Sequence, residues 1–100
     1  MSQGQDPAEV ARLRESIEDL DAKMLRLLAE RFRLVAELAR WKRGFGLPIE
    51  DAEREAYLHA LHERLAREQG LDPEFVQRLF ETILGRSKER QRDAQRSKRA

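Results

Sequence analysis

"LLAERFRLVAELARWK" (residues 27–42) is the segment that decides the fold, because its apolar residues recur every three or four positions. This spacing is typical of the buried face of an α-helix. Two cations, Arg31 and Lys42, lie on the same face, since they are eleven residues, or about three helical turns, apart. Val35 and Leu38 lie between them. The sequence therefore combines a core-like helix face with two positive charges.

The same spacing predicts one long helix from Ala8 to about Arg43, with Asp6 as its N-cap and Pro7 at its first position. The glycines and proline at residues 44–48 end the pattern. Such a helix would be roughly 54 Å long, whereas a compact chain of this length has a radius of gyration of about 13 Å. We therefore expect two copies of the chain to pack their long helices together as a homodimer.

Two shorter helices are predicted after it. Asp51 can cap a second helix that ends near Gln69, and Gly70 then provides a helix C-cap. Asp72 and Pro73 repeat the start signal for a third helix, which becomes polar toward the end of the chain. No alternation typical of β-strands occurs, so the predicted class is all-α.

Length and composition favour a single domain over residues 1–100, with frayed ends at about 1–6 and 93–100. There is no cysteine, no apolar run of membrane-spanning length and no signal-peptide pattern. The expected location is the cytoplasm.

The charge distribution argues against a nucleic-acid-binding protein. The net charge is +1, and positive charge is concentrated only from Lys88 onward, which favours a solvated helix end. His59 and His62 are three residues apart, but no cysteine or further histidine completes a metal site. We interpret both histidines as solvated surface residues and expect no metal.

Polar residues recur on the inward faces of all three helices. The residues three and four positions from Arg31 are all apolar, and a cation held there is costly unless an anion joins it or its head reaches water. Arg54 and Glu55 lie at the inner start of the second helix, and Ser87 and Gln91 continue the apolar face of the third. Interior donors of this kind predict a ligand site for a small dicarboxylate. Without a nucleophile or paired acids, chemistry there would depend on positioning and electrostatics.

The segments "LRESIEDLDAKMLRLLAERFRLVAELARWK", "PIEDAEREAYL" and "RLFETILGRSKERQ" resemble the all-helical (AroQ-class) chorismate mutases, from about Ala8 to Gln91. The resemblance implies an intertwined homodimer of three-helix chains with two active sites, each using both chains. It also implies an isomerase of aromatic amino acid biosynthesis, which converts chorismate to prephenate by a Claisen rearrangement without a cofactor.

The resemblance also implies roles for single residues. Arg31 and Arg54 would bind the substrate carboxylates, together with Arg14 from the partner chain. Lys42 and Gln91 would donate hydrogen bonds to the ether oxygen as its bond to carbon breaks. Arg14 lies about 25 Å along the helix from Arg31, so both reach one small ligand only if Arg14 comes from the partner.

At the other end of the ligand, the resemblance implies that Glu55 accepts a hydrogen bond from the ring hydroxyl, together with the backbone near Asp51. Ser87 would contact a carboxylate, and Val35 and Leu38 would form the pocket wall. Gln91 can donate at any ordinary pH, so we expect little pH dependence near neutrality from that position.

Other functions stay open on the sequence alone. Isochorismate pyruvate lyase resembles this pattern, but Glu55 argues against it. A 4-amino-4-deoxychorismate mutase fits as well, because a carboxylate can accept from an amine. A non-catalytic helical dimer that binds a partner or nucleic acid would not need inward polar groups. A larger enzyme of the aromatic pathway is a further candidate partner.

Overall fold

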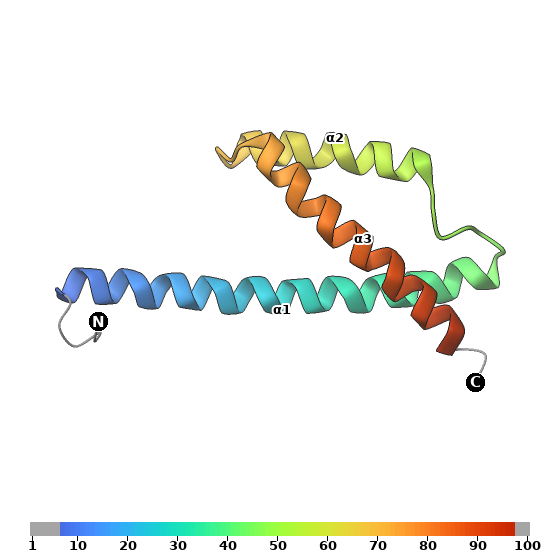
Figure 1. Cartoon of the computed structure of the whole chain (residues 1–100), viewed down its shortest axis with the longest axis horizontal. Helices are drawn as coiled ribbons and strands as arrows, with labels where there is room; N and C mark the ends of the chain where they lie inside the picture. Colours follow the sequence, from blue (N-terminus) through green and yellow to red (C-terminus); the bar gives the residue numbers. More distant parts are fainter. Residues whose placement is uncertain (1–6, 98–100) are drawn as a thin grey trace. The chain divides into compact units, whose positions relative to one another are not determined.

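The computed structural model describes residues 7–97 and contains three helices in that part of the chain (Figure 1). They are α1 (Ala8–Gly44), α2 (Ala52–Glu68) and α3 (Pro73–Ser97). No strand occurs within the described residues, so the predicted all-α class is confirmed. The expected cap Asp6 lies outside the described residues.

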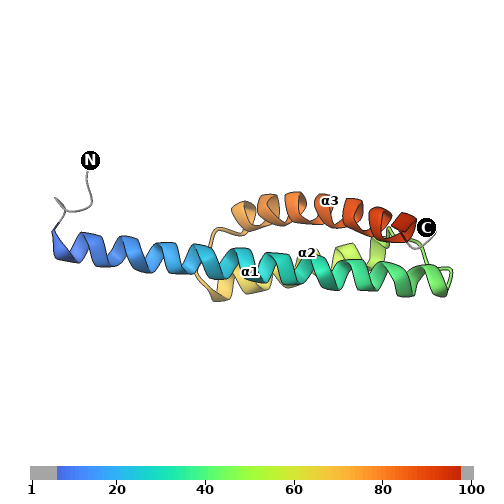
Figure 2. The ribbon, with the colours of Figure 1, turned by 90° about the horizontal axis from the view of Figure 1, so that it is seen from below.

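The chain divides into two units, one up to Arg33 and one from Leu34 onward, and α1 is an unbroken helix that contributes to both (Figure 2). The described part of the first unit is therefore mainly the N-terminal portion of α1. Its large apolar side chains at the predicted spacing are 53–65% exposed; they are Leu13, Ile17, Leu20, Met24 and Leu27. One helix cannot bury its own apolar face, and within the first unit this face is exposed.

In the second unit, α1 and α2 end just before Gly46 and Gly70, at the glycines that the sequence predicted as helix ends. Gly46 has a φ of 68° and Gly70 a φ of 70°, a backbone region that favours glycine. After α1, the N–H of Leu47 donates to the carbonyl of Lys42 at 2.7 Å. This bond belongs to a Schellman motif, which turns the chain back toward the helix it has just left.

The predicted caps of α2 and α3 are also present. The Asp51 carboxylate accepts from the backbone N–H of Arg54 at 3.0 Å, and that of Asp72 accepts from Glu74 at 3.2 Å. Helix α3 begins at Pro73, as predicted. These contacts depend on residues close in sequence, which is why they could be predicted.

Helices α2 and α3 form a hairpin (Figure 1) whose interface contains His62. The His62 ring stacks on Phe80 with 3.7 Å between ring centroids, and the residue is only 7% exposed. The prediction of a solvated His62 is wrong, because this residue follows Leu58 by one helical turn on the inward face. Within the described residues, no group of three or more His, Cys, Asp or Glu could hold a metal ion.

The C-terminal part of α3 packs against the last turns of α1. Gln95 Nε2 donates to the carbonyl of Ala39 at 3.0 Å, and Arg43 donates to the carbonyl of Gln95. Ala39 and Ala94 are both buried. The sequence predicted frayed ends at about 1–6 and 93–100. Residues 93–97 are instead the last residues of α3, and residues 1–6 and 98–100 lie outside the described part of the chain. No helix among residues 7–97 is long and apolar enough to cross a membrane.

Candidate active site

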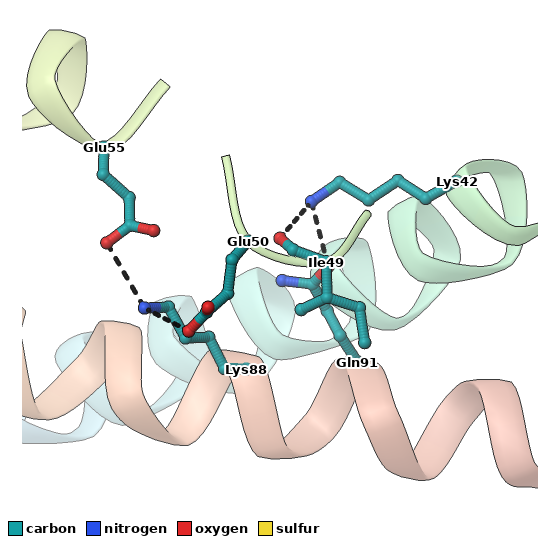
Figure 3. Close-up of polar contacts among 6 residues, drawn as sticks. All are labelled: Lys42, Ile49, Glu50, Glu55, Lys88 and Gln91. Atoms are coloured by element: carbon teal, nitrogen blue, oxygen red, sulfur yellow. Dashed lines mark hydrogen bonds and ion pairs between the residues drawn. The ribbon is translucent and has the colours of Figure 1, made fainter. Parts of the chain in front are cut away.

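Lys42 and Gln91 meet in the second unit (Figure 3). Lys42 Nζ lies 3.1 Å from Gln91 Oε1 and 2.9 Å from the carbonyl oxygen of Ile49, to both of which it donates. Gln91 is 7% exposed and Lys42 is half-buried. The structure therefore brings together the two residues that were expected to act on the same atom, although their roles stay predictions.

The turn after α1 holds Lys42 at both of its ends. Its backbone carbonyl accepts from Leu47, and its ammonium donates to Ile49 two residues further on. Because Gly46 lets the chain reverse, the carbonyl of Ile49 can face back toward the helix. This anchoring reduces the freedom of a side chain that otherwise has four rotatable bonds.

The contact also leaves donors for a ligand. An ammonium group has three N–H donors, and two of those on Lys42 are used by Ile49 and Gln91. Because the amide oxygen of Gln91 faces Lys42, its NH₂ group is directed elsewhere. One N–H of Lys42 and the NH₂ group of Gln91 are therefore not used in this contact and can donate to a ligand.

Lys88 links two carboxylates next to this pair and was missed by the sequence analysis (Figure 3). Its Nζ lies 3.3 Å from Glu55 Oε1 and 3.3 Å from Glu50 Oε1. The hydrogen bond with Glu55 raises the pKa of Lys88, the contact with Glu50 adds to this, and desolvation opposes it. The sequence predicted that Lys88 belongs to a solvated basic helix end. In the structure it is instead partly buried and paired with two carboxylates. Its position three residues before Gln91 was the available signal.

Three further predicted residues have local partners. The buried Ser87 donates its hydroxyl proton to the carbonyl of Ile83 at 2.8 Å, within α3. Asp51 caps α2. The guanidinium of Arg54 lies 5.0 Å from the centroid of the Tyr57 ring. None of these contacts joins the residue directly to Lys42 or Gln91, among the interactions that the structure describes.

The remaining predicted residues lie on α1. Arg14 and Arg31 belong to the first unit; Arg14 is exposed, and partial burial lowers the pKa of Arg31. Arginine titrates so far above neutrality that Arg31 stays charged. Val35 is half-buried and Leu38 is exposed. That Arg14 and Arg31 meet the same ligand as Lys42 stays a prediction.

Residues 13–92 match the family model of chorismate mutase type II. The chain is 32% identical over 80 residues to a chorismate mutase of Methanocaldococcus jannaschii, covering 80% of this chain and 81% of the relative.

Two other similar proteins are not named simply as chorismate mutases. A bifunctional chorismate mutase/prephenate dehydratase of Escherichia coli is 39% identical over 72% of this chain, which corresponds to 19% of that longer protein. A 4-amino-4-deoxychorismate mutase of Streptomyces pristinaespiralis is 30% identical over 79% of this chain and 60% of the relative. The family match covers most of the chain, including all of α2 and most of α1 and α3. The chain therefore belongs to the type II chorismate mutase family.

Proposed function

We propose that the protein converts chorismate to prephenate, without a cofactor. The observation that carries this proposal is the 3.1 Å contact between Lys42 and Gln91, which joins α1 to α3 and presents two sets of N–H donors. Membership of the chorismate mutase family supports the same reaction. In this rearrangement the bond from the ether oxygen to the ring breaks as a carbon–carbon bond forms within the same molecule.

The donor pair can stabilise the transition state of this reaction. Negative charge develops on the ether oxygen as its bond lengthens, and Lys42 and Gln91 would each donate a hydrogen bond to it. Because Ile49 already holds the ammonium in place, little reorganisation is needed during the reaction. Preorganised donors of this kind typically contribute roughly 10²–10³ in rate.

The arginines would bind the two carboxylates and hold the substrate in its reactive conformation. Arg31 and Arg54 would come from one chain and Arg14 from the partner chain of a homodimer, with Val35 and Leu38 as pocket wall. The exposed apolar face in the first unit supports the dimer, since a second copy would bury it.

Two local rearrangements follow from this binding mode. The Arg54 guanidinium would leave the face of Tyr57 to reach a carboxylate. Ser87 would redirect the proton that it now donates to Ile83.

Glu55 would accept a hydrogen bond from the ring hydroxyl, next to the backbone at Asp51. A second candidate substrate is 4-amino-4-deoxychorismate, because a carboxylate also accepts from an amine and the Streptomyces relative has that name. A larger enzyme of the aromatic pathway stays a candidate partner, since the E. coli relative is a bifunctional protein. The cytoplasm stays the predicted location.

The test is a product assay. Purified protein is incubated separately with chorismate, isochorismate and 4-amino-4-deoxychorismate, and the products are identified by mass spectrometry and NMR. We expect prephenate from chorismate and no pyruvate from isochorismate. The proposal fails if chorismate disappears no faster than in buffer, or if Lys42→Ala is as active as the parent.

A further inference from the structure

The ion pairs of Lys88 differ from the surface pairs elsewhere on α3. Arg86 and Glu89 lie on neighbouring turns of that helix, 3.6 Å apart, and such pairs contribute little. Lys88 instead joins three segments: α3, the start of α2 at Glu55, and the preceding loop at Glu50. The Lys88 side chain is 27% exposed, against 51% for that of Arg86. The contacts of Lys88 are therefore tertiary contacts at the edge of the candidate active site.

Lys88 also changes what Glu55 can bind. One oxygen of this carboxylate, Oε1, lies 3.3 Å from the ammonium, which leaves Oε2 to face a ligand. Lys88 offsets part of the negative charge of Glu55, because its single ammonium is shared between Glu55 and Glu50. A neutral hydroxyl can donate to Oε2 with little cost from Lys88, whereas a protonated amine would bring a second positive charge close to Lys88, and this repulsion would weaken its attraction to Glu55.

We propose that Lys88 is a positioning residue that makes Glu55 select a neutral ring hydroxyl over a ring ammonium group in an otherwise identical dicarboxylate. This inference rests on the proposed function, since it takes Glu55 as the acceptor of the ring substituent. The raised pKa of Lys88 supports it, because the residue then keeps its charge throughout the neutral range. Glu50 holds the ammonium from the side of the loop and so fixes its position next to Glu55.

The experiment compares two substrates that differ only at this ring position. The ratio of kcat/KM for chorismate to kcat/KM for 4-amino-4-deoxychorismate is measured for the parent and for Lys88→Met, Lys88→Arg and Arg86→Met. Methionine keeps an unbranched side chain but removes the charge, and arginine keeps the charge. Arg86→Met is the matched control, because it removes one positive charge from an exposed site on the same helix.

We expect the ratio to fall roughly tenfold in Lys88→Met, since repulsion at a partly exposed site is screened. Lys88→Arg and Arg86→Met should keep the parental ratio. A loss of structure alone would lower both rates and leave their ratio unchanged. If the parent does not turn over the amino compound, the expected result is a gain of that activity in Lys88→Met.

The outcomes separate the two proposals. An active parent whose ratio is unchanged in folded Lys88→Met overturns the role of Lys88 and leaves the proposed function intact. A parent that is inactive on chorismate overturns both. If circular dichroism shows that Lys88→Met is unfolded, Lys88→Gln, which removes the charge but keeps a polar side chain, is judged by the same ratio.

Discussion

The two parts of α1 differ in the contacts that their side chains make within the chain. Up to Arg33, the helix exposes most of its large apolar side chains. From Leu34 onward, it still exposes Leu34, Leu38 and Trp41, but Ala39 is fully buried and Lys42 is hydrogen-bonded to a loop carbonyl and to α3. The second unit thus assembles the donor pair within one chain, whereas the first unit presents an exposed apolar face, which we propose that a second copy buries. If Arg14 acts in the partner's site, its mutation should behave differently from mutation of Lys42 when chains are mixed.

The largest effect is expected at Lys42. The variant Lys42→Ala removes the ammonium that would stabilise the ether oxygen, and kcat for chorismate should fall by roughly 10²–10³. The measurement is steady-state loss of chorismate absorbance, with circular dichroism to confirm the fold.

Arg43→Ala is the matched control for that variant. It removes the neighbouring cation, which also contacts α3 but only through the carbonyl of Gln95. We expect kcat to change by less than about threefold, since no donor to the substrate is lost. Equal losses in both variants would mean that Lys42 acts through structure rather than through the substrate.

The next experiment tests whether Arg14 of one chain contributes to the active site of its partner chain. Arg14→Ala and Lys42→Ala should each be nearly inactive, but a co-expressed mixture forms heterodimers in which one of the two sites has both residues intact. With random pairing, about a quarter of all sites are then complete, so about a quarter of parental activity should return.

A second mixture provides the control. Lys42 and Gln91 come from the same chain, as their 3.1 Å contact indicates. Co-expressed Lys42→Ala and Gln91→Ala therefore place at least one defect in every site, and no activity should return. Recovery in this mixture, or none in the first, would contradict a site that takes Arg14 from one chain and Lys42 and Gln91 from the other.

A smaller, pH-dependent effect is expected at Gln91. An amide donates regardless of pH, so kcat/KM of the parent should vary by less than about twofold between pH 6 and 8. In Gln91→Glu the side chain donates only when protonated, so activity should fall by about tenfold per pH unit above the pKa of the new carboxyl group. A flat profile for Gln91→Glu would show that this position does not donate to the substrate.

The sequence predicted the helices well because their limits depend on neighbouring residues. Gly70, Asp72 and Pro73 end one helix and start the next through contacts within a few positions. His62 was assigned wrongly, since an imidazole is polar at its nitrogens but can stack through its faces, and only the α2–α3 packing decides between these environments.

The candidate site was less predictable than the helices. Apolar periodicity identified Lys42 as an anomaly, but its meeting with Gln91, 49 positions away, was expected only from the family resemblance. Lys88 was missed because its partners lie 33 and 38 positions before it. The spacing of Lys88 from Gln91 places it near the site, but no local spacing predicts its partners, because these depend on how the loop before α2 approaches α3.

The smallest effect concerns stability at high pH and isolates the ion pairs of Lys88. Its pKa is raised above the ordinary 10.5, chiefly by Glu55, so the folded state binds this proton more tightly than the unfolded state. The resulting stabilisation is present below about pH 10.5 and is lost as pH rises through the folded pKa.

The free energies of unfolding of the parent and of Lys88→Met, measured in urea, should therefore differ at pH 8 by less than about 1 kcal/mol, since the pair is partly exposed. That difference should be smaller at the highest pH at which both proteins still fold. Arg86→Met keeps Lys88 and should retain the pH dependence of the parent. A difference between parent and Lys88→Met that is the same at both pH values would mean that packing of the side-chain stem, not its charge, links α3 to α2.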